Sequence, residues 1–202
     1  MEGGFARTSK FERASNFEST WTADVLAGPP MIAPARQFTY PVRVGGEDEA
    51  MARGALLVQV RPSLGGSFLA TCALGFESAS LPSAVFACPR PDDLCALAGG
   101  YAYIFDTTDP ARSITIPLKP VVEVRPLPDH GLLLFVGFHA IAAWGADGLR
   151  WVSERLSWEG VGVGVVEETT LHGSGWDIRS DKEIPFELDL TTGRHTGGGY
   201  RL

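Results

Sequence analysis

Residues 132–158 read LLLFVGFHAIAAWGADGLRWVSERLSW, from Leu132 to Trp158, and form the most apolar stretch of the chain. Its most apolar part, residues 132–144, is shorter than the roughly 20 residues that a membrane-spanning helix needs. Gly137 interrupts it, and glycine destabilises a helix interior. Asp147-Gly148 follows, a pair typical of β-hairpin loops, and apolar and polar residues alternate after it. The stretch therefore predicts buried strands joined by tight turns.

The same order of strands and turns recurs on both sides of this stretch. Turn-forming clusters of Gly, Pro, Asp and Thr separate short apolar runs, and equivalent turns return about every 40 residues, the spacing of a four-stranded blade. The last unit is less regular, because a polar segment, residues 176–183, reads as a loop inserted between two of its strands. The expected strands cover residues 84–88, 94–98, 101–105 and 113–118, then 121–125, 132–136, 139–144 and 149–155, then 161–167, 170–173 and 185–190.

Three segments carry a resemblance to a known architecture. Leu133–Gly137, Ile141–Trp144 and Asp147–Trp151 together resemble a blade of a quinoprotein-type β-propeller. Asp189–Gly193, read as DLTTG, is similar to the turn of that blade. The chain as a whole resembles uncharacterised bacterial proteins with GGYAYI and GWD-type segments, and this resemblance implies no function.

The expected fold is therefore all-β, an antiparallel meander of propeller-like four-stranded units. The units lie near residues 42–83, 84–120, 121–158 and 159–194 of a single domain that covers residues 42–202. Three blades are too few to close a ring, so closure depends on the unit near residues 42–83, and a β-sandwich and an open half-propeller are the alternatives. Trp144 and Trp151 are expected to be cross-strand neighbours in the core, and the alternative is an exposed sugar-stacking surface.

Residues 1–41 are expected to form an extended, partly irregular N-terminal arm. Gly28-Pro29-Pro30 and Pro34 cannot continue a helix or enter a central strand. Four aromatic residues in this polar context would anchor the arm on its own domain or on a second subunit; they are Phe5, Phe11, Phe17 and Trp21. A homodimer is therefore one expected assembly, through the arm or through exposed strand edges.

Charge and composition narrow the partners and the compartment. The formal net charge is −7, which disfavours a nucleic-acid surface because such surfaces cluster Lys and Arg. The chain has no apolar run long enough for a membrane span, and its first residues, MEGGFARTSK, lack the apolar core of a signal peptide. We therefore expect a cytoplasmic protein with reduced, buried thiols at Cys72, Cys88 and Cys95.

No cofactor and no metal are expected. His139, His172 and His195 could join the cysteines in a metal site, but none of the usual ligand spacings occurs. The sequence has no Cys-x-x-Cys, no His-x-x-x-His and no His-Glu-x-x-His.

The richest polar cluster runs from Leu171 to Glu183 and includes the expected inserted loop. Its candidate binding residues are His172, Trp176, Asp177, Arg179, Asp181 and Glu183. Loops on rigid β scaffolds often carry binding sites, and two carboxylates beside an aromatic platform can act on a glycosidic bond. The competing interpretation is a solvated loop closed by its own ion pairs.

The absence of any catalytic signature favours a non-enzymatic binding or interaction module for an unknown ligand. The alternative is a carbohydrate-binding or glycoside-hydrolysing β domain that uses the loop from Trp176 to Glu183. Whether the protein is an enzyme is not decided by the sequence, although the missing motifs favour a protein without catalytic activity.

Overall fold

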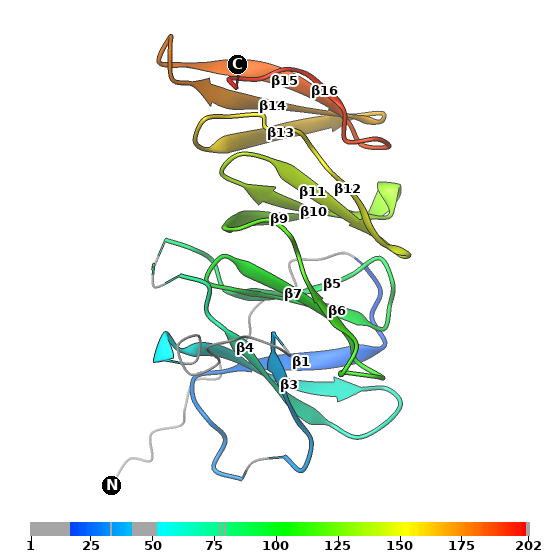
Figure 1. Cartoon of the computed structure of the whole chain (residues 1–202). Helices are drawn as coiled ribbons and strands as arrows, with labels where there is room; N and C mark the ends of the chain where they lie inside the picture. Colours follow the sequence, from blue (N-terminus) through cyan, green and yellow to red (C-terminus); the bar gives the residue numbers. More distant parts are fainter. Residues whose placement is uncertain (1–16, 33, 42–51, 77, 79, 201–202) are drawn as a thin grey trace, which may run out of the picture.

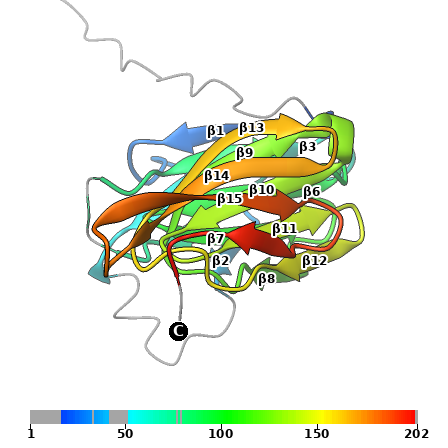
Figure 2. The ribbon, with the colours of Figure 1, turned by 90° about the horizontal axis from the view of Figure 1, so that it is seen from above.

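The computed structural model describes residues 17–32, 34–41, 52–76, 78 and 80–200. It confirms the all-β, propeller-like prediction, because the described chain folds into four sheets of four strands each. The sheets follow one another in sequence order and lie face to face as a stack (Figure 1). Seen from above, they overlie one another (Figure 2). The first and fourth sheets lie at opposite ends, so the described strands form an open stack and not a ring.

Each sheet is built from a continuous stretch of chain. The first contains β1 (Trp21–Leu26), β2 (Gln37–Tyr40), β3 (Ala55–Pro62) and β4 (Phe68–Ala73); the second contains β5 (Ala84–Ala87), β6 (Asp93–Ala98), β7 (Tyr101–Asp106) and β8 (Ser113–Thr115). The third contains β9 (Val121–Leu127), β10 (Leu132–Gly137), β11 (Ile141–Gly145) and β12 (Gly148–Val152), with the 3-10 turn η1 (Pro128–His130) after β9. The fourth contains β13 (Val161–Glu167), β14 (Thr170–Asp177), β15 (Lys182–Asp189) and β16 (His195–Gly197).

The last three sheets are simple antiparallel meanders, as expected, but the first is not. Its strand order is β1-β3-β4-β2, and β2 runs parallel to β4. The segment 27–36 between β1 and β2 carries the chain away from β1, so β2 joins the opposite edge of the sheet. A purely antiparallel meander is therefore wrong for this sheet.

The segment expected to be an arm supplies two strands. β1 and β2 complete the first sheet, and Trp21 is only 4% exposed at the interface with the second sheet. Phe17 also packs against the core, while Phe5 and Phe11 lie outside the described residues. The alternation in WTADVL, residues 21–26, signals a strand, but the neighbouring prolines outweighed that signal in the prediction.

Three apolar interfaces hold the four sheets together. The middle strands are buried on both faces, so they read as continuous apolar runs and not as alternating ones. In β6, for example, Leu94 and Ala96 face the first sheet, whereas Cys95 and Leu97 face the third. Cys72 lies in the first interface and Cys88 and Cys95 in the second, and burial raises the pKa of all three thiols. The described residues leave all three cysteines unbridged, which confirms the prediction of buried free thiols.

The two tryptophans around the Asp147-Gly148 turn are both buried, but they are not direct neighbours. Trp144 pairs with Leu149, and Trp151 pairs with Ala143, because the register shifts between Ala143 and Trp144. The bulge places Trp144 in the second interface and Trp151 in the third. The predicted core location is confirmed, and the predicted cross-strand contact is wrong.

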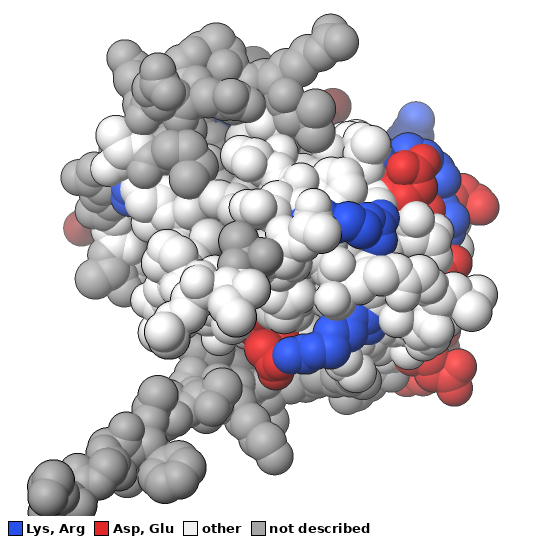
Figure 3. Space-filling model, turned by 90° about the horizontal axis from the view of Figure 1, so that it is seen from below, with Lys and Arg blue, Asp and Glu red and all other residues white. Residues whose placement is uncertain are grey.

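The lower end of the stack, formed by the first sheet, is partly covered by its own chain. In Figure 3, the described part of the lower end shows mostly uncharged side chains, with charged ones toward one side. Residues 27–32 and 34–36 lie beneath the first sheet (Figure 1), and Leu69, whose neighbour Ala70 faces the core, is only 5% exposed on that outer side. Among the described residues, no helix is long and apolar enough to cross a membrane.

Candidate functional site

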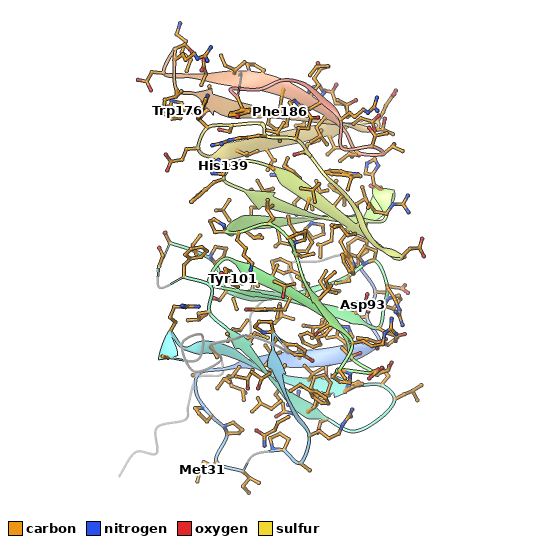
Figure 4. The ribbon with its side chains drawn as sticks, viewed as in Figure 1. Met31, Asp93, Tyr101, His139, Trp176 and Phe186 are labelled. Atoms are coloured by element: carbon orange, nitrogen blue, oxygen red, sulfur yellow. The ribbon has the colours of Figure 1, made fainter. Side chains whose placement is uncertain are left out.

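A pocket of about 690 Å³ lies between the second and third sheets, at the end where β6 begins and β7 ends. One side is formed by the second sheet and its loops, and the other by the hairpin between β11 and β12. Its charged lining residues on the second sheet are Arg90, Asp93, Asp106 and Arg112. Figure 4 shows Asp93 at this end of the sheet and Tyr101 at the other.

The strand period explains why two carboxylates face this pocket. Asp93 pairs with Asp106, and the next pair along the same strands with side chains on the same face is Cys95 with Ile104. Cys95 and Ile104 belong to the apolar interface with the third sheet. On this face of β6 and β7, the apolar side chains of the interface are therefore followed by Asp93 and Asp106, so the apolar core ends here and a polar pocket begins.

Asp106 has a structural role at the turn after β7. Its Oδ1 accepts hydrogen bonds from the backbone N–H and hydroxyl of Thr108 at 2.9 and 2.6 Å and from the N–H of Asp109 at 3.2 Å. Its Oδ2 lies 3.0 Å from Arg90 Nη2 and 3.2 Å from Arg112 Nη1. Burial pushes its pKa upward, but these hydrogen bonds and the Arg90 charge outweigh burial and hold the pKa below its ordinary value.

Asp93 has a different environment, although it lies directly opposite. Its side chain is only 10% exposed, and its nearest charged partner is Arg90, with Nη1 3.9 Å from Oδ1. Within the described residues, its carboxylate accepts no hydrogen bond. Burial raises the pKa of Asp93, the charge of Asp106 adds to this shift, and Arg90 opposes it without cancelling it. Asp93 is thus a buried carboxylate that faces the pocket without a donor.

The opposite side of the pocket consists of one tryptophan and a hairpin with short side chains. Trp144 is 7% exposed, and the hairpin beside it consists of Ala146, Asp147 and Gly148. The Trp144 Nε1–H is buried and has no hydrogen-bond partner among the described residues. Ala146 and Gly148 have little or no side chain, so the pocket stays open beside Trp144. The pocket therefore combines an aromatic wall with acceptors and donors on its other side.

The residues predicted from the sequence lie elsewhere, on the hairpin of β14 and β15. The expected inserted loop is wrong, because both strands continue through it and only residues 178–181 form the turn. Apolar runs identified the other strands, and the polar segment 174–184 lacks one because its outer face has no sheet above it. Figure 4 shows Trp176 on the top sheet, far from Asp93.

Two of these residues stabilise the turn itself. Asp177 accepts hydrogen bonds from the Arg179 N–H at 3.1 Å and the Ser180 hydroxyl at 2.7 Å, and these bonds lower its pKa. Asp181 accepts a 3.0 Å hydrogen bond from Trp176 Nε1. Arg179 is exposed in the turn.

The other predicted residues share the outer face of the fourth sheet. Glu183 pairs with Trp176, and His172 lies four residues before Trp176 on the same strand face. His172 Nε2 is 3.6 Å from a Glu167 oxygen, and its Nδ1 is 4.0 Å from a Glu187 oxygen. His172, Glu167 and Glu187 are thus close in space on an open face, and of these three only Glu187 also lines a smaller pocket, of about 260 Å³, beside β16.

The sequence contains one signal for the pocket that the prediction missed. Asp93 and Asp106 sit at the start of one strand and the end of the next, and both were assigned to turns. Extending the strand alternation by one residue would have placed both carboxylates on the same buried face. No group of three or more His, Cys, Asp or Glu side chains in the described parts of the chain is arranged to hold a metal ion.

Comparison with known proteins assigns no family. No protein-family model matches the chain, and no curated protein matches it in sequence. Among solved structures, the crystal structure of Citrobacter koseri AztD matches with a TM-score of 0.40 and 11% sequence identity, over 73% of this chain and 48% of AztD. The chain thus spans less than half the length of that protein, and the description of the fold rests on its own strands.

Proposed function

We propose that the protein is a non-enzymatic binding module and that its ligand site is the pocket between the second and third sheets. The observation that carries this proposal is the Asp93 carboxylate, which is nine-tenths buried, faces the pocket and accepts no hydrogen bond from the described residues. A buried polar group without a partner costs about 1–3 kcal/mol. A ligand that donates a hydrogen bond to Asp93 would remove this cost.

The geometry supports binding better than catalysis. Two neighbouring carboxylates with pKa values shifted in opposite directions are a common arrangement of a general acid and a general base. Here Asp106 is committed to the turn and to two arginines, so its oxygens are not available to a substrate proton. Of the two paired aspartates only Asp93 lacks a donor among the described residues, and the third carboxylate of the lining, Asp147, is 91% exposed on the opposite wall, with Arg150 Nη1 3.9 Å away. One carboxyl group without a free carboxyl neighbour does not make an acid–base pair.

Blocking the pocket tests this proposal. Ser113 is exposed and lines the pocket, and the three native cysteines are buried, so a Ser113→Cys variant can be labelled selectively with a bulky thiol reagent. Lys182→Cys, on the exposed start of β15, is the matched control. We expect compounds found by a small-molecule thermal-shift screen to lose their effect on labelled Ser113→Cys protein and to keep it on labelled Lys182→Cys protein. Hits that are insensitive to the Ser113 label would show that the pocket is not the site.

The outer face of the fourth sheet is a second candidate site, for carbohydrate. Trp176 is half-buried there, its ring fixed by the hydrogen bond to Asp181, with Glu183 opposite on the next strand. An exposed aromatic face beside a carboxylate can stack on a sugar ring. Glycoside hydrolysis has less support, because Asp177 and Asp181 already serve the turn. Unchanged binding of a Trp176→Ala variant across a glycan panel would remove this candidate.

Self-association and a cytoplasmic location remain predictions, as does the absence of nucleic-acid and membrane partners. The four sheets leave short edge strands, among them β8 and β16 with three residues each. β1 and β2 belong to the first sheet and Phe17 packs against the core. A truncation that tests the role of the arm in dimerisation should therefore remove residues 1–16 alone. A solution mass that falls from dimer to monomer when residues 1–16 are removed would assign dimerisation to the arm.

A further inference from the structure

We infer that the ligand of this pocket is a neutral, hydroxyl-rich molecule of the size of a mono- or disaccharide. The inference rests on the proposed function, that the pocket binds a ligand, and names the chemical class of that ligand. Three properties of the pocket carry it: the balanced charge of its second-sheet side, its mixture of donors and acceptors, and its apolar wall.

The charged groups on the second-sheet side of the pocket balance one another. Asp93 and Asp106 carry two negative charges, and Arg90 and Arg112 carry two positive charges on the same side. A cationic ligand that reached Asp93 would meet both guanidinium groups, which lie around the neighbouring Asp106. An anionic ligand that reached the guanidinium groups would meet Asp93 and the 91% exposed Asp147 across the pocket. A neutral ligand avoids both repulsions.

The free hydrogen-bonding groups match hydroxyl groups. Asp93 is an acceptor without a donor. Arg90 and Arg112 each give one hydrogen bond to Asp106, so most of the five N–H donors of each guanidinium remain available. Arg112 is 63% exposed and can turn them toward a ligand. A hydroxyl group both donates and accepts, so neighbouring hydroxyls on one ring can satisfy a carboxylate and a guanidinium together.

The remaining wall suits the apolar face of a sugar ring. Trp144 from β11 and Ile104 and Ile114 from the second sheet line the pocket, and Ile114 is 41% exposed. Carbohydrates present a face of C–H groups that packs against aromatic and aliphatic side chains. The volume of about 690 Å³ lies within the usual range for small-molecule sites and leaves room for one or two sugar rings.

A panel of matched sugars tests the inference. Glucose, glucosamine and glucuronate differ in the charge of a single substituent, and maltose adds a second neutral ring; galactose and mannose extend the neutral set. Binding would be followed through the indole N–H signal of Trp144 in ¹H–¹⁵N spectra, identified by its loss in Trp144→Phe. We expect at least one neutral sugar to shift this signal saturably and to bind at least tenfold more tightly than its charged counterparts.

Variants of the pocket complete the test. Asp93→Leu should weaken the neutral sugar at least tenfold, with Asp93→Asn as the conservative variant if the first fails to fold. Glu159→Leu, at an exposed position outside the pocket lining, is the matched control and should change binding less than twofold. If pocket-blocked compounds from the screen bind while no neutral sugar does, the inference falls and the proposed function stands. If a sugar binds but Trp176→Phe abolishes its binding, the inference falls in favour of the fourth sheet.

Discussion

Tyr40 provides the sharpest test of how the first two sheets are joined. It is fully buried on β2, and its ring stacks on Phe105 of the second sheet with centroids 4.4 Å apart and planes 8° apart. Its hydroxyl donates a 2.7 Å hydrogen bond to the carbonyl of Pro110, which is itself buried. Burial raises the pKa of Tyr40, so the phenol keeps its proton and remains a donor at any ordinary pH.

The Tyr40→Phe substitution removes the hydroxyl and keeps the ring. It leaves the buried Pro110 carbonyl without this donor, so the free energy of unfolding should fall by about 2 kcal/mol, within the range for a buried hydrogen-bonding group that loses its partner. Tyr40→Ala also removes the stacked ring and should cost about 3–5 kcal/mol. Both values come from urea unfolding followed by circular dichroism, with the slope against urea unchanged.

Tyr101→Phe is the matched control. Tyr101 is half-buried on the neighbouring β7, and its hydroxyl makes no hydrogen bond to any described residue, so removing it should change the free energy by less than about 0.5 kcal/mol. If Tyr40→Phe were as stable as wild type, or if both variants lost the same amount, the contact between β2 and the second sheet would not stabilise the fold as described.

Three further predictions concern other parts of the stack. Asp93 has a folded pKa above its unfolded value, so stability falls as pH rises from about 4 through the raised pKa; Asp93→Asn should therefore raise the melting temperature at pH 8 with a difference that shrinks below pH 4, and a destabilised variant at pH 8 would contradict this. Gly173→Ala would place a Cβ 2.4 Å from the Gly162 carbonyl oxygen and should cost about 3 kcal/mol or more in urea unfolding, whereas Gly28→Ala, with no atom of a described residue within 4 Å, should be nearly neutral. Trp151→Phe removes the 2.8 Å hydrogen bond from Nε1 to the Leu190 carbonyl and should cost about 1–2 kcal/mol, measured the same way; a neutral effect would argue against that link between the third and fourth sheets.

The sequence predicted the middle of the fold well because local signals agree there. In β10 and β11, apolar runs, a turn and an Asp-Gly pair all indicate buried strands, and the structure confirms them. The prediction failed where signals compete or depend on distant partners. β1 is surrounded by proline-containing loops, and its partner β3 lies more than thirty residues away. The parallel pairing of β2 with β4 depends on the path of a loop, which no local pattern encodes.

The candidate site was harder to predict for a similar reason. A charged residue beside a turn is usually solvated, so Asp93 and Asp106 were read as parts of loops. Their burial depends on a third sheet whose hairpin ends in Ala146, Asp147 and Gly148, and on two arginines from different loops. The polar segment 172–183 resembles a binding site in sequence because its charged residues lie close together, whereas in the structure two of its carboxylates stabilise the hairpin of β14 and β15.

Because the two ends of the stack differ, a further sheet could pack onto only one of them. Each sheet gains its apolar contacts only from its immediate neighbours, so the architecture is modular along one axis, like a solenoid. At the lower end, residues 27–32 and 34–36 lie under the first sheet, and a further sheet there would have to displace them. At the upper end, β14 and β15 present an uncovered face. An added blade would extend the protein from that end by repeating the hairpin pattern, without disturbing the pocket two sheets below.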